Sequence, residues 1–540
     1  MLTMWGVFTS LRMLVVVFLL MLFTVKLLIY YIIKNTKNYW EQYSTPHEKT
    51  TFFFGNLARV ILGRLSMAEY LQIVYNKHKS HRYVGIYQFQ KPTLILRDLK
   101  LINEITVREF DKFPQHVLYT SEKADPIWAH NLFAMPGNQE WKDLRATLSP
   151  AFTSNKLKTL FYLIDKCAQS FTEHLLEKNS LVEVEMKEAF AKLTNDIIAS
   201  TALGATCNSL KDPHNAIYKM GVNTADIAKF PKNLKFFMNN INTKLTELMK
   251  VRFISEEVRV FFQKIIQDSI KMRESTSTFR PDIIQLLMEA RKGQLKVDTG
   301  ADTSLEIAAV SEASETFEEK SAKIEITDDI MTAQAVIFFL AGFDTSSTAM
   351  SFAAYELALH PHIQQKLLNE IRNTMGKEGE KLTYQIVTSM KYLDMVVSEV
   401  LRKWPPFAVT DRTTVQNYVI QPAAEGELPV PINSDVLCLI PIFAIHRDPE
   451  HFPNPEEFNP DRFLGITKRP PGFLPFGSGR RNCIGSRFAL LEIKIALIHL
   501  LLKFEIVPIE KTPIPIVLSK TNVNPISDRG FWLGLKPRHN

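Results

Sequence analysis

The sequence predicts a mainly α-helical protein with small β-sheets, preceded by one N-terminal transmembrane helix. Three observations support this fold class: an apolar run near the N-terminus, a central region whose apolar residues recur every three or four positions, and a few short alternating stretches. The chain has 540 residues, of which 46% are hydrophobic and 22% charged. This composition excludes a disordered or collagen-like chain and provides for a large core.

The first predicted element is a membrane-spanning helix over residues 13–33. These residues are apolar except for Thr24 and Lys26, and a helix that spans a bilayer needs about 20 such residues. Tyrosines and lysines follow the run, where a signal peptide would have small residues before a cleavage site. A buried or cleaved helix is the alternative. The charge bias around the run favours a body on the cytosolic side.

The rest of the chain predicts one body, because no stretch is rich enough in Gly and Ser to separate domains. We expect a membrane anchor at 1–34, a connector at 35–56 and a single catalytic domain at 57–540. Within it, the pattern predicts strands at 83–97, helices over 141–350, an acidic surface loop at 297–329, a strand at 436–442 and an apolar helix at 488–504.

Charge and cysteine usage exclude several functions. A net charge of +7 over 540 residues is too diffuse to predict nucleic-acid binding. The four cysteines, Cys167, Cys207, Cys438 and Cys483, are far apart and form no Cys-x-x-Cys pair. They therefore predict neither a disulfide framework nor a zinc cluster, and a reducing compartment is expected.

The most informative segment is the glycine-rich loop at residues 476–485, Phe-Gly-Ser-Gly-Arg-Arg-Asn-Cys-Ile-Gly. Gly477 and Gly479 allow backbone conformations closed to other residues and the close approach of a flat ligand. Cys483 stands just before a long predicted helix, where the helix N-terminus and nearby arginines favour a thiolate. A nucleophile, a redox thiol and an axial metal ligand are all compatible with these residues.

This loop resembles the Phe-x-x-Gly-x-Arg-x-Cys-x-Gly haem-binding loop of the cytochrome P-450 superfamily. Four further segments resemble other marks of that family, in the family's order: Trp141-Lys-Asp-Leu-Arg145, Ala341-Gly-Phe-Asp-Thr-Ser346, Glu399-Val-Leu-Arg402 and Phe458-Asn-Pro-Asp-Arg-Phe463. The resemblance covers residues 141–485 and implies the cytochrome P-450 fold.

The resemblance implies a haem b cofactor whose iron is ligated by the Cys483 thiolate, an electron-rich ligand that promotes O–O bond cleavage. Phe476 and Gly485 of the same loop are expected to border the cofactor. The haem propionates need charged or N–H donors. The resemblance assigns them four residues: Trp141, Arg145, Arg412 and Arg480.

On the opposite side of the haem, the resemblance places the oxygen-binding helix. Ala341 and Gly342 are small residues in an apolar helix, which predicts a close neighbour there. Thr345 can return its hydroxyl to the preceding turn of the helix. Asp344 and Thr345 are then the expected catalytic residues, relaying protons to oxygen during its activation.

Three charged residues are expected to have an architectural role. Glu399 and Arg402 lie three positions apart on a helix and can form an ion pair. By resemblance, Arg462 completes a buried triad that supports the haem loop.

The chain shows no nicotinamide or flavin motif of its own. The resemblance therefore implies NADPH-cytochrome P-450 reductase as the electron donor, with a cytochrome b-type protein as a possible second donor. A basic surface around Lys142, Arg145 and Arg481 is the expected docking site. Residues 229–238 mix lysines with large apolar side chains, which predicts a second contact with the lipid bilayer.

The expected function is insertion of one oxygen atom from O2 into lipophilic substrates: xenobiotics, hormones or lipids. Residues 113–136 and the phenylalanines Phe338, Phe339 and Phe343 are expected to line an apolar substrate cavity. Residues 280–293 resemble microsomal insect members of the family, which implies the endoplasmic reticulum membrane. The alternatives are a haem-thiolate isomerase that rearranges peroxides and a membrane-anchored haem protein that senses gas without turnover.

Overall fold

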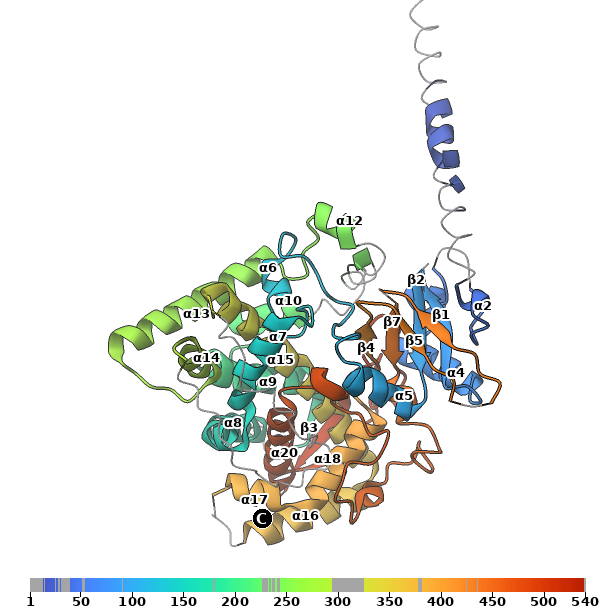
Figure 1. Ribbon diagram of the computed structural model, residues 1–540. Helices are drawn as coiled ribbons and strands as arrows, with labels where there is room; N and C mark the ends of the chain where they lie inside the picture. The colour runs from blue at the N-terminus through green and yellow to red at the C-terminus, as the bar shows by residue number, and fades with distance from the viewer. Residues whose placement is uncertain are drawn as a thin grey trace, which may run out of the picture.

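The computed structural model describes residues 13, 15–24, 26–27, 30, 39–50, 54–89, 91–177, 180–225, 232, 235, 238–239, 243–293, 325–376, 381–423, 425–434 and 436–538. Helices form most of the body. Figure 1 shows β1, β2, β4, β5 and β7 on one side, whereas β3 lies among the helices, near α20 and α18. The prediction of a mainly helical protein with small sheets is confirmed. Most of the predicted acidic loop at 297–329 and most of 229–238 lie outside the described residues.

The helices are α2 (Tyr39–Gln42), α3 (Ala58–Ile61), α4 (Met67–Lys77), α5 (Leu99–Asn103), α6 (Pro126–Ala129), α7 (Gln139–Leu148), α8 (Ser154–Leu176), α9 (Met186–Ala202), α10 (Ala216–Ala225), α12 (Thr243–Leu248), α13 (Glu256–Thr276), α14 (Ile283–Arg291), α15 (Asp328–Leu359), α16 (Pro361–Met375), α17 (Tyr384–Ser389), α18 (Lys391–Lys403), α19 (Ile442–Ile445) and α20 (Ser486–Lys503). Shorter helical turns are η1 (Glu104–Arg108), η2 (Ser149–Phe152), η4 (Pro460–Phe463) and η5 (Gly479–Arg481).

The strands are β1 (Tyr83–Gln88), β2 (Lys91–Leu96), β3 (Val182–Glu185), β4 (Thr410–Thr413), β5 (Tyr418–Ile420), β6 (Val430–Ile432), β7 (Leu437–Ile440), β8 (Phe504–Val507) and β9 (Trp532–Pro537). They form sheets of order β1-β2-β7-β4, β3-β9-β8 and β5-β6. The predicted strands at 83–97 are the antiparallel pair β1–β2, and the strand predicted at 436–442 is β7, which pairs with β2 in parallel.

Helix α15 is the central helix of the body and begins at a well-formed N-cap. The Thr327 hydroxyl accepts a hydrogen bond from the Ile330 N–H, and two aspartates in the first turn favour the positive end of the helix dipole. Apolar residues surround the helix on all sides, which is typical of a helix buried in a core. Among the described residues, α15 is long and apolar enough to cross a bilayer, but most of it is buried inside the protein.

The predicted anchor is described only in part. Val15–Thr24 forms a short apolar helix with exposed side chains. Figure 1 draws this helix away from the body.

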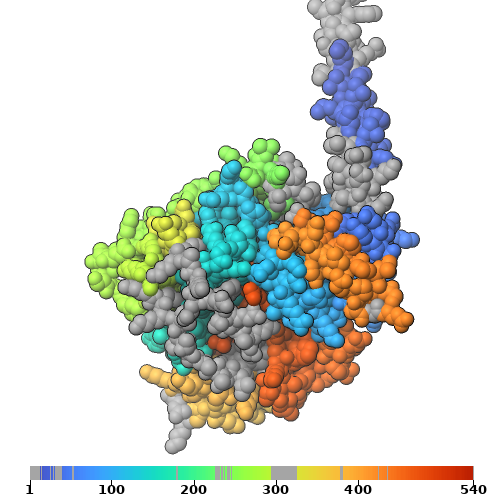
Figure 2. Space-filling view, in the orientation of Figure 1, coloured from blue at the N-terminus to red at the C-terminus, as the bar shows by residue number. Residues whose placement is uncertain are grey.

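Part of the segment expected to be a connector packs on the four-stranded sheet. Trp40 is fully buried, and its indole N–H donates to the Ile86 carbonyl at 2.9 Å. Its ring lies against Gly85, where an added Cβ would come within 2.6 Å of it. Tyr39 donates to the Pro431 carbonyl at 3.1 Å, and Figure 2 shows the blue N-terminal segment against the orange segment that carries β5 and β6. Residues from Tyr39 onward therefore contribute to the body.

Candidate functional site

The glycine-rich loop runs from Phe476 into the start of α20 and is held by its own backbone. The Cys483 N–H donates to the Phe476 carbonyl at 2.9 Å. Gly479 has a φ of +70°, and an added Cβ would lie 2.0 Å from the Thr106 carbonyl oxygen. Glycine is therefore required there both for its conformation and for the close approach of η1. This packing fixes the position from which Cys483 leaves the loop.

The surroundings of Cys483 indicate a hollow next to its thiol. Cys483 is exposed, yet the surrounding protein raises the pKa of its thiol by desolvation. Both observations hold when a group borders an enclosed space instead of bulk water. The Gly485 N–H and the Arg145 guanidinium act in the opposite direction and lower this pKa, so both favour a thiolate.

Three arginines from distant segments form a cationic cluster near this hollow. They are Arg145 of α7, Arg412 of β4 and Arg481 of the loop. Arg145 and Arg412 both lower the pKa of Arg481, and Arg145 also interacts with the Cys483 thiol. The Asp411 carboxylate raises the pKa of Arg412 and of Arg481. Burial lowers the pKa of Arg145 and of Arg412 to about 10. Three guanidiniums beside one carboxylate make a site that favours an added anion.

The predicted propionate ligands are partly rearranged by the structure. Trp141 and Arg145 lie on one face of α7, as predicted, and Arg481 stacks on the Trp141 ring with its guanidinium carbon 3.9 Å from the ring centre. The Trp141 indole N–H donates to the Leu132 carbonyl at 2.9 Å. Arg480 lies elsewhere, over the ring of Phe110 at 5.4 Å.

Arg481 was expected on a basic docking surface, and this prediction is wrong. Arg481 is buried and donates to backbone carbonyls, including those of Pro114 at 2.8 Å and Met135 at 2.7 Å. Arg145 donates to the Asn482 side-chain oxygen at 2.7 Å, and Lys142 pairs with the exposed Asp111 at 2.7 Å. The sequence contained the signal for Arg481, since it occupies the fixed arginine position of the loop pattern.

The Arg412 guanidinium retains an unsatisfied group in this cluster. Its Nη2 donates to the Ser478 carbonyl at 2.7 Å and its Nη1 to the Asp411 carbonyl at 2.6 Å. Its Nε is buried without a hydrogen-bond partner among the described residues. A buried donor of this kind is costly unless a further group satisfies it.

Helix α15 is accessible around the predicted oxygen motif. Ala341 is exposed and Gly342, Asp344 and Thr345 are half-buried, although most of the helix is buried. The Thr345 hydroxyl donates to the Ala341 carbonyl at 2.7 Å, as its position in a helix predicts. The close neighbour of Gly342 is Ile198 of α9, 2.4 Å from an added Cβ. The absence of a side chain at Gly342 thus serves the packing of α9 on α15.

Asp344 is held by Lys187, a residue that the sequence did not single out. The Lys187 Nζ lies 2.8 Å from the Asp344 carboxylate, 2.9 Å from the Asp344 carbonyl and 2.6 Å from the Ser347 hydroxyl. Lys187 is the second residue of α9 and is 157 positions from Asp344 in the chain. No local pattern connects the two residues, so only the packing of α9 on α15 reveals the pair.

The three architectural residues form a buried network. Arg402 and Glu399 are fully buried and form a two-bond ion pair, with distances of 2.7 and 2.9 Å. Arg462 of η4 completes it, with its Nε 3.0 Å from the Glu399 carboxylate. Arg402 also donates to the His446 carbonyl at 2.9 Å. This network joins α18 to the segment that precedes the glycine-rich loop.

The phenylalanines expected to line a substrate cavity belong to the core. Phe339 is fully buried, with 0% of its surface accessible, so it borders neither solvent nor a cavity. It stacks on Phe343 with ring centres 5.9 Å apart and contacts Phe262 of α13 at 5.1 Å. Phe338 contacts Phe152 at 5.3 Å. The prediction that Phe339 forms a cavity wall is wrong, because it is needed to pack α13 on α15.

The residues around the hollow fit the expected haem. A thiol that faces the space, a cationic cluster with one carboxylate and an unsatisfied arginine donor suit a metal-containing ring that carries two carboxylates. Gly477 and Gly485 would leave room for such a ring, since an added Cβ at either position lies no closer than 3.8 Å to a neighbour.

Comparison with known proteins gives a family match along most of the chain. The family model described as Cytochrome P450 matches residues 46–529. The chain is 40% identical to Cytochrome P450 9e2 of Blattella germanica over 524 residues, which cover 93% of this chain and 94% of the relative. It is 35% identical to Probable cytochrome P450 9f2 of Drosophila melanogaster over 533 residues, 96% of this chain and 99% of the relative.

Proposed function

Because the chain belongs to the cytochrome P450 family and is therefore a haem-thiolate monooxygenase, we propose that it is a microsomal enzyme that oxygenates lipophilic substrates. Cys483 is the proposed iron ligand, and NADPH-cytochrome P-450 reductase is the proposed electron donor. The substrates are xenobiotics, hormones or lipids, and the catalytic domain faces the cytosol from the endoplasmic reticulum membrane.

The observation that carries this assignment is the position of the Cys483 thiol. It faces the hollow and lies close enough to Arg145 for the guanidinium to favour its thiolate form. The other three cysteines differ. Cys438 is fully buried, and burial raises the pKa of both Cys438 and Cys167 to about 12 and that of Cys207 further. Cys483 is therefore the proposed thiolate.

Haem b, when bound, would supply the oxygen-activating iron, which the Cys483 thiolate would hold. Arg145, Arg412 and Arg481 would hold its propionates, with Trp141 beneath Arg481 in support. Arg480, which the sequence suggested, is replaced by Arg481 in this proposal because Arg481 is the buried member of the cluster. Phe476 and Gly485 would border the ring on the side of Cys483.

Asp344 and Thr345 are the proposed proton-transfer residues. They lie on the accessible stretch of α15. The Thr345 hydroxyl donates its proton to the Ala341 carbonyl of its own helix, which leaves its oxygen able to accept a hydrogen bond from a proton donor. The Asp344 carboxylate is kept in place by Lys187 and would pass protons toward Thr345. Water is the proposed source of the protons.

The proposal is tested with the Cys483→Ser variant of the full chain. The wild-type protein, reduced and exposed to carbon monoxide, is expected to show the absorption band characteristic of thiolate ligation, and to form product with NADPH and reductase. The variant is expected to lose both. Cys438→Ser is the matched control and should retain them. A thiolate-type spectrum in the Cys483→Ser variant would contradict the assignment.

Turnover separates the proposal from the two alternatives. Oxygenated products from a panel of lipophilic compounds, formed only with reductase present, support the monooxygenase. Rearrangement of peroxides without reductase would instead indicate an isomerase. A thiolate-type spectrum with no product from any compound would favour a gas-binding protein.

A further inference from the structure

A second pocket lies away from the hollow that Cys483 faces. It has a volume of about 540 Å³, within the range of small-molecule sites. Its walls come from α8, α9, the loop after α9 and Arg280, which precedes α14. Helix α9 separates it from the haem side, since the same helix contacts α15 through Lys187 and Ile198.

One wall of the pocket is a continuous face of α8. Tyr162, Lys166 and Ser170 follow one another at intervals of four, and Leu163, Cys167 and Phe171 do the same one position later, so all six share a face of the helix. The face is open to solvent at one end, where Tyr162 is 67% exposed. The pocket therefore offers an apolar wall with a polar rim.

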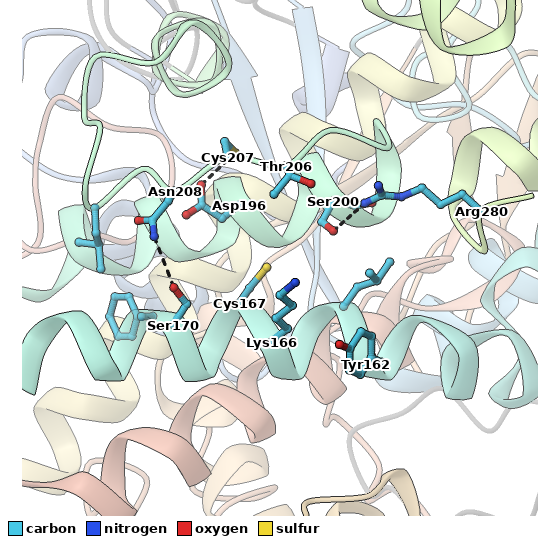
Figure 3. A pocket seen from close by; sticks show the side chains of 13 residues that line it. Tyr162, Lys166, Cys167, Ser170, Asp196, Ser200, Thr206, Cys207, Asn208 and Arg280 are labelled. Carbon is cyan, nitrogen blue, oxygen red and sulfur yellow. Dashed lines mark hydrogen bonds between the residues drawn. The ribbon is translucent and has the colours of Figure 1, made fainter. Parts of the chain in front are cut away.

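The charges of the pocket are unevenly placed. Figure 3 shows Ser200 and Arg280 toward one end, Ser170 and Asn208 toward the other, and Cys167, Cys207 and Asp196 between them. Lys166 stands next to Cys167, on the side of Ser200. Ser170 and Asn208 are joined by a hydrogen bond of 3.4 Å, which ties α8 to the loop. The end with Arg280 favours an anionic group of a ligand, whereas the end with Ser170 and Asn208 offers only neutral polar groups.

The Asp196 carboxylate is committed to the loop. It accepts hydrogen bonds from the Ser209 N–H at 2.8 Å and from the Cys207 thiol at 3.0 Å. The two thiols in the middle of the pocket are neutral, because burial raises the pKa of Cys167 and of Cys207. The middle of the pocket therefore has no strong affinity for a cation.

The cationic end keeps an excess of positive charge. Arg280 donates to the Ser200 carbonyl and hydroxyl at 3.1 and 3.0 Å, which fixes its guanidinium at the pocket wall. Its ion-pair partner is Asp282 at 3.3 Å, but Asp282 is already bound by the buried Arg273 through two hydrogen bonds. Lys166 is exposed and, among the described residues, forms no ion pair.

We propose that this pocket is a second binding site, which takes a small amphipathic organic anion. The carboxylate of the ligand would lie between Lys166 and Arg280, and its apolar body would lie along Leu163 and Phe171. The site is separate from the haem cavity and does not depend on the substrate of the enzyme.

The test uses the full-length holoenzyme, with the haem cavity blocked by an azole that coordinates the iron. The probe is 4-phenylbutyrate, titrated by calorimetry, and its neutral analogue 4-phenylbutan-1-ol is the matched ligand. Binding of one equivalent of the acid, about tenfold tighter than that of the alcohol, is the expected result. The carbon monoxide spectrum before the titration shows independently whether the haem site is intact.

The variants locate the site. Lys166→Glu is expected to weaken 4-phenylbutyrate about tenfold, because it replaces attraction by repulsion at an exposed position. Ser170→Tyr is expected to fill the pocket and abolish binding. Lys158→Glu is the control, with the same charge change on the same helix, at a residue that lies over Tyr384 and outside the pocket. No binding to the azole-blocked enzyme, or equal affinities for wild type, Lys166→Glu and Lys158→Glu, would overturn the proposal.

Discussion

Lys187 places three hydrogen bonds on α15 at the position of the proposed proton-transfer residues. It holds the carboxylate and carbonyl of Asp344 and the hydroxyl of Ser347, and its side chain is only 15% exposed. An ion pair that is partly shielded from water is stronger and more directional than one on the surface. Lys187 is therefore a positioning residue, which limits where the Asp344 carboxylate can lie.

Replacing Lys187 by Met should free Asp344 without removing a catalytic group. We expect the fraction of NADPH electrons recovered in oxygenated product to fall about tenfold, because small displacements of a catalytic group have effects of this size. The measurement compares NADPH consumed, product formed and hydrogen peroxide released. Lys192→Met is the control, since Lys192 lies on the same helix and pairs with Glu188 instead. Unchanged coupling in Lys187→Met would contradict this role.

Glu492 of α20 is a fully buried acid whose proton affects stability. Burial raises its pKa to about 8, and the hydroxyl of Ser346 offsets only part of this effect. The unfolded chain releases this proton near the ordinary glutamate pKa of about 4.3, whereas the folded protein keeps it up to about 8. Within this window the folded state binds more protons, so the free energy of unfolding falls as pH rises.

The Glu492→Gln variant should remove this dependence. The free energy of unfolding of the variant minus that of the wild type is expected to be smallest near pH 5. This difference should grow by up to about 1.4 kcal/mol per pH unit toward pH 8, because only the wild type loses stability there. Denaturant unfolding of both proteins at pH 6, 7 and 8 measures the difference. A stability difference that is constant over this range would show that Glu492 titrates normally in the folded protein.

At the scale of the element, the glycine-rich loop depends on two glycines for different reasons. Gly477 and Gly479 both have positive φ angles, of +79° and +70°. Around Gly477, an added Cβ would have no neighbour closer than 3.9 Å, whereas at Gly479 it would lie 2.0 Å from the Thr106 carbonyl oxygen. The first glycine supplies conformation alone, and the second also permits contact with η1.

Two alanine substitutions separate these effects. Gly477→Ala should lower the unfolding free energy by about 1–2 kcal/mol, the cost of a left-handed conformation for a residue with a Cβ. Gly479→Ala adds a backbone collision and should cost more, with displacement of η1 and loss of retained haem. The measurements are denaturant unfolding and the ratio of haem to protein after purification. Equal losses in the two variants would show that the contact with Thr106 is unimportant.

At the scale of the whole molecule, the body begins before the boundary that composition suggested. The predicted connector at 35–56 contributes Trp40, which is fully buried on the four-stranded sheet. A buried tryptophan is among the largest single contributors to stability, and its removal typically costs about 3–5 kcal/mol. The body therefore includes residues from Tyr39 onward, which the sequence had placed in the connector.

Two truncated proteins test this boundary. A chain that begins at residue 35 should unfold with the same free energy as the body of the full chain, because it retains Trp40. A chain that begins at residue 57 should be less stable by about 3–5 kcal/mol. Trp40→Ala in the longer chain should reproduce most of the loss. If both truncated proteins unfold alike, the packing of Trp40 does not contribute to the stability of the body.

The sequence by itself determined the helical fold class, the β1–β2 pair, helix α20 and the family, because these depend on periodicity and on motifs read within single segments. It also indicated Cys483 and the network of Glu399, Arg402 and Arg462, whose members occupy fixed motif positions. Tertiary structure decided which side chains from distant segments meet. It placed Arg481 in the cationic cluster, Lys187 on Asp344 and Trp40 on the sheet. Such contacts depend on how whole helices and strands pack. The loop pattern marked Arg481 as a fixed position but not its neighbours, and no local pattern connects Lys187 with Asp344 or Trp40 with the sheet.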